Sequence, residues 1–344
     1  MAEKYFTEEF LSKISEFTAP LSKSELETYI KEGEESVLLR AAHGVEPQAF
    51  LNLVENIGVY LRCNSGSSFT SDYQSFKITD DISLWSFQLP GGGNLNVFDT
   101  KSGKLIIDTG YGCFFEDCRR MAESLGLGNF SDVKRVICTH TDADHCGASG
   151  YFDQIPYMHP AAKDIIDMGT RGFGSKNGLE ILEKFYTTTI NTFSEMFVHE
   201  EAELCRTVEI KKHGLFSVID YYSFDDLEFE VWESLGGHIA GQIFLYEPKL
   251  GILFTSDALL NFSTFSKARA EYSSIADAMI GSVNVFSDAA RTERYELMRL
   301  AKVMDDELKR SDRFLLIVCG HGLVSRLDDS GKLVPASDSK FYSV

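Results

Sequence analysis

The segment at residues 140–145, HTDADH, carries four side chains that can bind a metal ion. Imidazole nitrogen and carboxylate oxygen are common metal ligands, and few structural roles need so many of them together. On an extended loop, residues i and i+2 point to the same side, so His140 and Asp142 can share one ion. Asp144 and His145 then turn toward a neighbouring position. The spacing therefore suits two adjacent metal ions.

Three segments further along the chain place a potential ligand after a strand. His238 follows two glycines after a predicted strand, Asp257 follows the apolar run GILFT, and His321 follows FLLIVC. Ligands that come from several strand ends can meet on one edge of a sheet sandwich, where they are held rigidly. We therefore expect these side chains to converge on one site, although they span 181 positions (321 − 140).

The composition excludes several classes of protein. The chain has 344 residues, 44% of them hydrophobic, which is enough for a large core. Its 33 Lys and Arg against 52 Asp and Glu give a formal net charge of −19, which repels nucleic-acid backbones and anionic lipids. The N-terminus lacks the apolar core of a secretion signal, and no apolar run reaches the ~20 residues of a membrane span. We expect a soluble, cytoplasmic protein with reduced cysteines, a small-molecule substrate and no nucleic-acid or membrane partner.

The periodicity of the chain divides it into three parts. Residues 1–70 are predicted to be a helical N-terminal extension, with a capping box at Ser22 and Glu25. Residues 75–330 are predicted to be a β-led domain whose strands lie at 82–89, 94–99, 104–109, 134–139, 227–233, 242–247, 251–256 and 314–319. Helices are expected at 114–125 and 291–310, and a helical cap controlling access to the site at about 160–200, with its second helix running from Leu179 to about Val198. Residues 331–344 are predicted to be a C-terminal tail.

Four segments resemble the metallo-β-lactamase fold superfamily, in the family's order, over roughly residues 75–330: LIIDTG, THTDADHCG, GGHIAGQIFLYEPKLGILFTSDALL and IVCGHG. The resemblance implies an α/β (α+β) fold, an αββα sandwich of two mixed β-sheets with helices on the outer faces and the site along one edge. It implies a first metal ion on His140, Asp142 and His238. It implies a second on Asp144, His145 and His321, with Asp257 bridging both.

The sequence departs from the family at Asp142, where most hydrolytic members have histidine. A carboxylate adds negative charge and a hard oxygen donor, which favours iron or manganese relative to zinc as the two divalent metal ions. Three carboxylates and a bridging hydroxide sum to −4, which balances two divalent ions and would also help a trivalent state. Alternatively, Asp142 hydrogen-bonds a ligand histidine without touching the metal.

Three functions are compatible with these residues. The first is a dinuclear metal-dependent hydrolase in which a metal-bridging hydroxide attacks a small ester, thioester, lactone, amide or phosphoester, while Asp144 and Asp257 orient it and relay a proton. The second is a non-haem diiron protein that binds or reduces dioxygen or nitric oxide. It resembles flavodiiron proteins without the flavodoxin domain and would need a separate redox partner. The third is a pseudo-enzyme that uses the helical N-terminal segment for protein interaction, and such a protein would retain no metal. The oligomeric state stays open.

Overall fold

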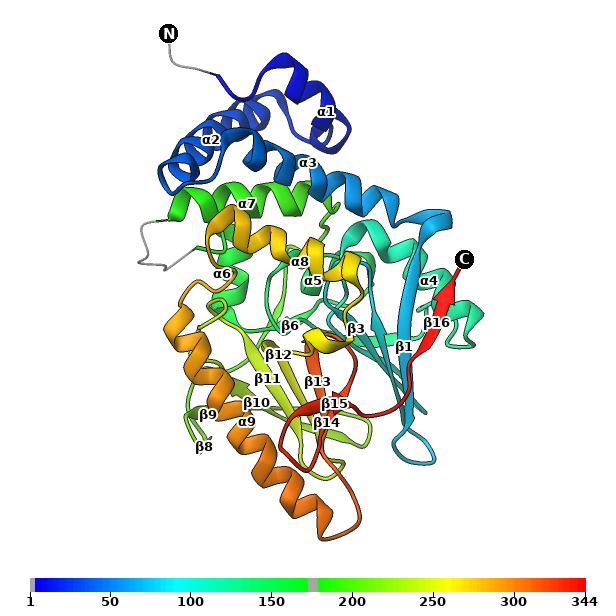
Figure 1. The fold of residues 1–344 in the computed structure, drawn as a ribbon. Coiled ribbons are helices and arrows are strands. Elements are labelled where there is room, and N and C mark those ends of the chain that lie inside the picture. Colours follow the sequence, from blue (N-terminus) through cyan, green and yellow to red (C-terminus); the bar gives the residue numbers. More distant parts are fainter. Residues whose placement is uncertain (1–3, 173–178) are drawn as a thin grey trace.

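The computed structural model describes residues 4–172 and 179–344. Within them, two eight-stranded mixed sheets pack face to face, and helices cover both outer faces (Figure 1). The fold is therefore the αββα sandwich that the sequence predicts. None of the described helices is long and apolar enough to cross a membrane.

The first sheet takes strands from both ends of the chain. In spatial order its strands are β16 (Lys340–Ser343), β1 (Thr70–Lys77), β2 (Ser83–Gln88), β3 (Asn94–Thr100), β4 (Gly103–Ile107), β5 (Val133–Ile137), β6 (Tyr157–Met158) and β7 (Glu203–Leu204). Neighbours are antiparallel from β16 to β4 and parallel from β4 to β7. The glycines at 91–93 lie in the turn between the antiparallel strands β2 and β3.

The second sheet comes from the C-terminal half. In spatial order its strands are β15 (Leu333–Pro335), β14 (Ser325–Leu327), β13 (Leu316–His321), β12 (Ile252–Leu260), β11 (Ile243–Glu247), β10 (Leu227–Glu233), β9 (Phe216–Phe224) and β8 (Lys211–His213). The β12–β13 pair is parallel, so these two strands end at the same edge. That edge carries the candidate site.

Helices form an outer layer on each side. On the side of the first sheet lie α4 (Phe115–Ser124), α7 (Glu180–Phe193) and α8 (Lys267–Ile280). The N-terminal helices α1 (Glu8–Thr18), α2 (Lys23–Ala42) and α3 (Pro47–Cys63) pack on α7 and α8 (Figure 1). The second sheet is covered by α9 (Ser287–Lys309). Two shorter helices, α5 (Ala143–Cys146) and α6 (Pro160–Met168), lie between strands of the first sheet in the chain.

Three apolar clusters hold these layers together. The cluster between the sheets joins Phe98 and Ile107 of the first sheet to Phe229 and Phe254 of the second. A second cluster packs α9 on the outer face of the second sheet. The largest joins the outer face of the first sheet to α1–α4, α7 and α8. The N-terminal helices therefore share one apolar cluster with α7, α8 and the first sheet.

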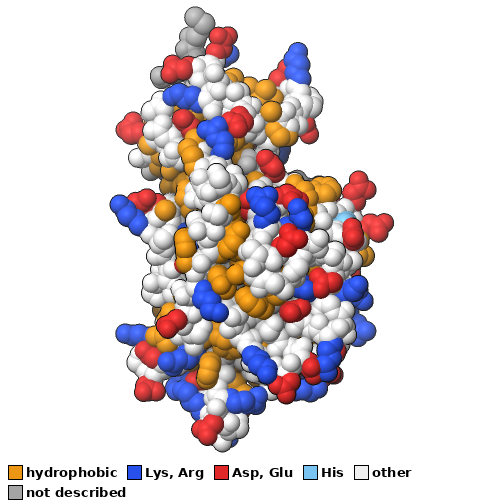
Figure 2. All heavy atoms as spheres, turned by 90° about the vertical axis from the view of Figure 1, so that its right-hand side faces the viewer, with side chains coloured by type: hydrophobic (Ala, Val, Ile, Leu, Met, Phe, Trp, Pro, Cys, Tyr) orange, Lys and Arg blue, Asp and Glu red, His pale blue; other side chains and the backbone are white. Residues whose placement is uncertain are grey.

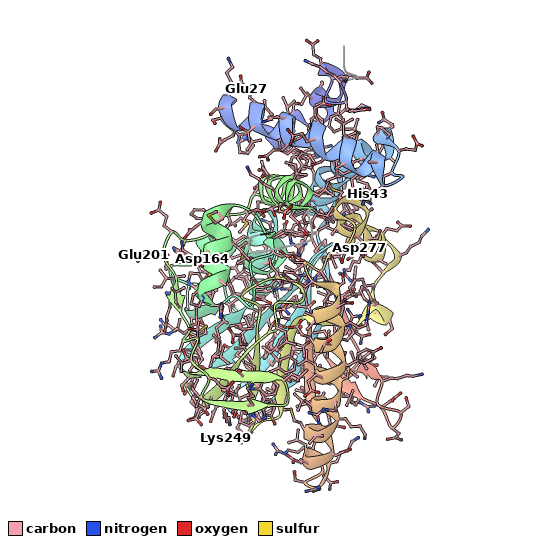
Figure 3. All side chains as sticks on the ribbon, turned by 90° about the vertical axis from the view of Figure 1, so that its left-hand side faces the viewer. Glu27, His43, Asp164, Glu201, Lys249 and Asp277 are labelled. Atoms are coloured by element: carbon pink, nitrogen blue, oxygen red, sulfur yellow. The ribbon has the colours of Figure 1, made fainter. Side chains whose placement is uncertain are left out.

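The predicted N-terminal extension is helical, and its local signals act as expected. The side chain of Ser22 accepts from the backbone of Glu25, whose carboxylate accepts from the backbone of Ser22. At its other end α2 meets α8, because Arg40 Nη2 donates to the carbonyl of Ala278 at 2.9 Å. Figure 3 labels His43 just beyond α2 and Asp277 on α8, on the same side of the molecule.

Two segments differ from their predicted form. The residues expected as a tail, 331–344, contribute β15 to the second sheet and β16 to the first, because β16 pairs with the free edge of β1. The second helix of the expected cap ends at Phe193 rather than near Val198. Beyond it, Phe197 pairs through its backbone with Gly147 and Gly150, which draws the chain out of the helix. Most of the glycine-rich link in this region, 173–178, lies outside the described residues.

The surface carries charges of both signs. In the face shown in Figure 2, Lys and Arg side chains are interspersed with Asp and Glu. The net charge of −19 therefore does not leave this face uniformly acidic.

A substitution in α7 can test whether the helical layer belongs to the core. Phe185 on α7 is fully buried, and its ring contacts Phe6, Tyr29 and Phe50 of the N-terminal helices. We expect Phe185→Ala to lower the free energy of unfolding by about 3–5 kcal/mol through the cavity it leaves. Urea denaturation measures this, with Phe341→Ala as the control because Phe341 is 65% exposed. Equal losses for the two variants would contradict the packing described.

Candidate metal centre

The seven predicted ligands lie at one edge of the sandwich. His140 follows β5, His238 follows β10, and His321 is the last residue of β13. Asp257 lies within β12, where the register with β13 shifts and Ser256 has a positive φ of 47°. Such bulges re-aim a side chain, here toward the other ligands. The remaining three ligands, Asp142, Asp144 and His145, lie at the start of α5.

The first predicted set is compact. One potential ligand atom from each of His140, Asp142 and His238 lies within 4.8 Å of the other two. The Nε2 atom of His238 is 3.1 Å from Oδ2 of Asp142, and Nε2 of His140 is 3.8 Å from that oxygen. These atoms face a common point, as they must to share one ion.

The second predicted set lies beside it. Potential ligand atoms of Asp144, His145 and His321 also lie within 4.8 Å of one another. The Nε2 atom of His321 is 3.2 Å from Oδ2 of Asp144 and 3.3 Å from Nε2 of His145. The structure thus brings together the two triads that the sequence predicts.

Asp257 lies between the triads. Its Oδ1 is 3.1 Å from Nε2 of His145, and its Oδ2 is 3.2 Å from Nε2 of His321 and 3.6 Å from Nε2 of His238. One carboxylate therefore reaches histidines of both sets. This is the position that a bridging ligand needs.

His140 shows that the cluster is suited to a metal ion. Its Nδ1 lies 2.9 Å from the hydroxyl of Ser256, whereas its Nε2 has no hydrogen-bond partner among the described residues. Burial and the neighbouring His145 lower the pKa of His140 to about 3, so the ring is neutral. A buried polar atom without a partner is costly. A neutral imidazole whose free nitrogen faces carboxylates is the form that binds a cation.

Asp108 fixes the orientation of His145. Its carboxylate accepts from the backbone of Thr139 at 2.7 Å and from the hydroxyl of Thr139 at 2.8 Å, and it lies 2.9 Å from Nδ1 of His145. The contact at Nδ1 turns Nε2 toward the centre. Asp108 holds a positive φ of 58°, so the backbone at the end of β4 is bent to make these contacts.

Glycines allow the backbone to approach the ligands closely. A Cβ atom on Gly320 would lie 1.9 Å from Oδ1 of Asp257, and one on Gly93 would lie 2.6 Å from Cε1 of His145. Any larger residue at these positions would displace a ligand.

Arg171 is a buried partner of Asp142 that the sequence did not reveal. It is 2% exposed, and its Nε and Nη2 donate to the two oxygens of Asp142 at 3.1 and 3.0 Å. Its Nη2 also donates to the carbonyl of Val283 at 2.8 Å, and Glu183 lies 3.5 Å from Nη1. This forked contact leaves Oδ2 of Asp142 facing both His238 and His140.

The guanidinium of Arg171 changes the net charge around the first predicted metal position. Burial alone would raise the pKa of Asp142, but Arg171 and His238 outweigh it and hold that pKa well below its usual range. Asp142 is therefore ionised, and Arg171 offsets the negative charge that distinguishes it from histidine. The negative charge of Asp142 therefore favours iron less strongly, whereas its hard oxygen donor still favours iron or manganese.

A cavity of about 360 Å³ opens onto the centre. Asp142, Asp144, His238, Asp257 and His321 line it, together with side chains of α3, α7 and α8. Tyr186 and Ile190 place α7 of the predicted cap beside the site. That the segment 160–200 controls access stays a prediction. Helix α8, absent from the predicted elements, contributes more of the wall than α7 does.

Comparison with known proteins bears on this arrangement. The sequence profile of the metallo-beta-lactamase superfamily matches residues 89–321, which include all seven predicted ligands. The chain belongs to the metallo-beta-lactamase superfamily. Membership of this superfamily, together with the His and Asp clusters, supports a metal-dependent hydrolase in general. Comparison with curated proteins finds no match.

Several solved structures are similar to this chain. AidC, a dizinc quorum-quenching lactonase in complex with a product, is 13% identical with a TM-score of 0.45, over 78% of this chain and 98% of that one. BJP-1, a subclass B3 metallo-beta-lactamase of Bradyrhizobium japonicum, is 15% identical with a TM-score of 0.41, over 72% and 77%. A metallo-beta-lactamase from Pontibacter korlensis is 14% identical with a TM-score of 0.41, over 73% and 92%.

The Asp142–Arg171 pair can be tested without metal. Arg171→Met leaves a buried carboxylate without its guanidinium, so we expect the metal-free protein to lose about 3–5 kcal/mol of unfolding free energy. The additional change Asp142→Asn removes the other charge and should recover part of this loss. Urea denaturation in the presence of a chelator measures both.

The control is Arg291→Met, because the side chain of Arg291 is 65% exposed. We expect it to change the unfolding free energy by less than about 0.5 kcal/mol. A similarly small effect of Arg171→Met would show that the pair does not stabilise the protein.

Proposed function

We propose that the protein is a dinuclear metal-dependent hydrolase of a small substrate with an ester, thioester, lactone, amide or phosphoester bond. The observation that carries this proposal is the pair of buried triads on either side of Asp257, at the base of a cavity large enough for a small molecule. The geometry fits two divalent ions, because each triad offers imidazole nitrogen and carboxylate oxygen to one point. We assign the first ion to His140, Asp142 and His238, and the second to Asp144, His145 and His321.

Two divalent ions, when bound, act as Lewis acids and make hydroxide available near neutral pH. Asp257 and Asp144 are our candidates for orienting the attacking water and for passing its proton to the leaving group. Both line the cavity, and Asp144 extends from the start of α5 beside Asp257. His140 and His145 are fully buried, so they hold the base of the site and do not contact bulk water.

The metal preference depends on Asp142 and Arg171 together. The oxygen donor of Asp142 favours iron or manganese, but Arg171 removes most of the added negative charge, so zinc is also accommodated. The diiron alternative rests on the carboxylate at position 142, and the buried guanidinium weakens it. Metal analysis and the visible spectrum of anaerobically purified protein separate the two. Colourless zinc-containing protein supports the hydrolase, and a diiron charge-transfer band would support the redox protein.

Asp257 is the ligand whose loss should do most damage. We expect Asp257→Ala to lose at least one metal ion and to lower the hydrolysis rate of p-nitrophenyl acetate by at least about 100-fold, because two adjacent cations would lose the anion between them. Elemental analysis and the esterase rate are measured on the same sample.

Asp288→Asn serves as the control, since that side chain is 97% exposed on α9. It should retain the metal content and the rate of the unmodified protein. If Asp257→Ala also kept two ions and full activity, the bridging role would be wrong. If the unmodified protein bound no metal, the pseudo-enzyme reading would replace the hydrolase.

A further inference from the structure

The cavity beside the metal centre has an apolar wall built from three distant stretches of the chain. Ile57 of α3, Ile190 of α7 and Ile275 of α8 line it, and each is at least nine-tenths buried. Phe262, which is 61% exposed, also lines the cavity. The N-terminal extension therefore supplies part of the wall. Such a surface favours an apolar group of a ligand.

Outside the metal cluster, the cavity has few cationic side chains that could attract an anion. Among the described residues that line the cavity, Arg294 is the one Lys or Arg, and its side chain is exposed to solvent. Asp277, also exposed, lines the same cavity. Because solvent screens exposed charges, Arg294 gives a phosphoryl group little attraction beyond that of the metal ions.

Tyr272 is a fixed polar group in this wall. It is 6% exposed, and its ring stacks on Tyr60 of α3 with centroids 4.2 Å apart and an interplanar angle of 24°. Gly91 leaves room for the stack, because a Cβ atom there would lie 2.6 Å from each ring. The ring of Tyr272 is therefore held between the extension and the β2–β3 turn.

The hydroxyl of Tyr272 is buried in this wall and has no hydrogen-bond partner within the described part of the chain. Its ring lies edge-on to that of Tyr111, with centroids 6.5 Å apart. Burial raises the pKa of both tyrosines well above the ordinary value, so both stay protonated. A buried O–H without an acceptor is unfavourable, and a ligand oxygen would satisfy it.

We propose that the substrate is an uncharged carboxylic ester, lactone or amide with an aliphatic acyl chain, which lies along the apolar wall while Tyr272 donates to a substrate oxygen. This inference rests on the proposed hydrolytic function. In the reaction, water adds to the acyl carbon and the C–O or C–N bond breaks. The products are a carboxylate and an alcohol or amine, and no oxidant or reductant is consumed.

Binding of two neutral amides tests the apolar wall. Metal-loaded full-length protein is titrated calorimetrically with acetamide and with hexanamide, which has four more methylene groups. Each buried methylene contributes roughly fourfold in affinity, so hexanamide should bind at least about tenfold more tightly. Equal affinities would overturn the proposal.

Two exposed alanines of α8 give a matched pair of variants. Ala270 lines the cavity, whereas Ala268 is not among the residues that line it. Ala270→Phe should weaken hexanamide binding by roughly tenfold and leave acetamide unaffected, and Ala268→Phe should change neither. The same effect from both variants, or from neither, would contradict an acyl pocket at this wall.

Tyr272→Phe removes only the hydroxyl that we assign to the substrate. It should weaken both amides by roughly tenfold, whereas Tyr60→Phe, which removes a hydroxyl from the stacked neighbour, should not. Unchanged amide binding by Tyr272→Phe would remove this residue from the proposal.

Hydrolysis rates separate this inference from the function on which it rests. Faster turnover of p-nitrophenyl hexanoate than of p-nitrophenyl acetate supports the acyl pocket. Faster turnover of bis(p-nitrophenyl) phosphate than of either ester would overturn the inference while leaving a metal-dependent hydrolase. No hydrolysis by protein that binds no metal would refute the proposed function itself.

Discussion

The structure depends on one constraint, the burial of acidic side chains among imidazoles at a single sheet edge. Carboxylate oxygens of Asp142, Asp144 and Asp257 lie 3.1–3.8 Å from Nε2 atoms of the neighbouring histidines. Among the described residues, Nε2 of His140 has no hydrogen-bond partner. Buried carboxylates repel one another unless positive charge lies among them. Metal ions held by the two triads would relieve this repulsion. The parallel β12–β13 pair, the bent backbone at Asp108 and the close approach of Gly320 all serve to hold the ligands where that charge is needed.

The helical layers contribute to the site as well as to the fold. Arg171, which lies between α6 and α7 in the chain, pairs with Asp142. Side chains of α3, α7 and α8 form the cavity wall. Because Phe185 packs α7 against the N-terminal helices, the wall and the extension share one core.

The ligands could be predicted from the sequence because each lies in one short segment or soon after a predicted strand. Four lie within HTDADH, and the others follow recognisable strands, so residue type and spacing predicted one site with two adjacent ions, and the resemblance to the superfamily assigned the two triads. Arg171 was not predicted, since a single arginine before a glycine-rich stretch carries no signal of the carboxylate 29 positions earlier. Strand β16 was not predicted either, because it forms by pairing with the free edge of β1. Tyr272 also carries no local signal, because its ring is held by Tyr60, more than 200 positions away.

Anomalous diffraction from crystals of the metal-loaded protein tests the central claim most directly. Our account predicts two adjacent peaks, one next to His140, Asp142 and His238 and the other next to Asp144, His145 and His321, with Asp257 contacting both and Arg171 still holding Asp142. A single peak, or two peaks away from Asp257, would contradict it.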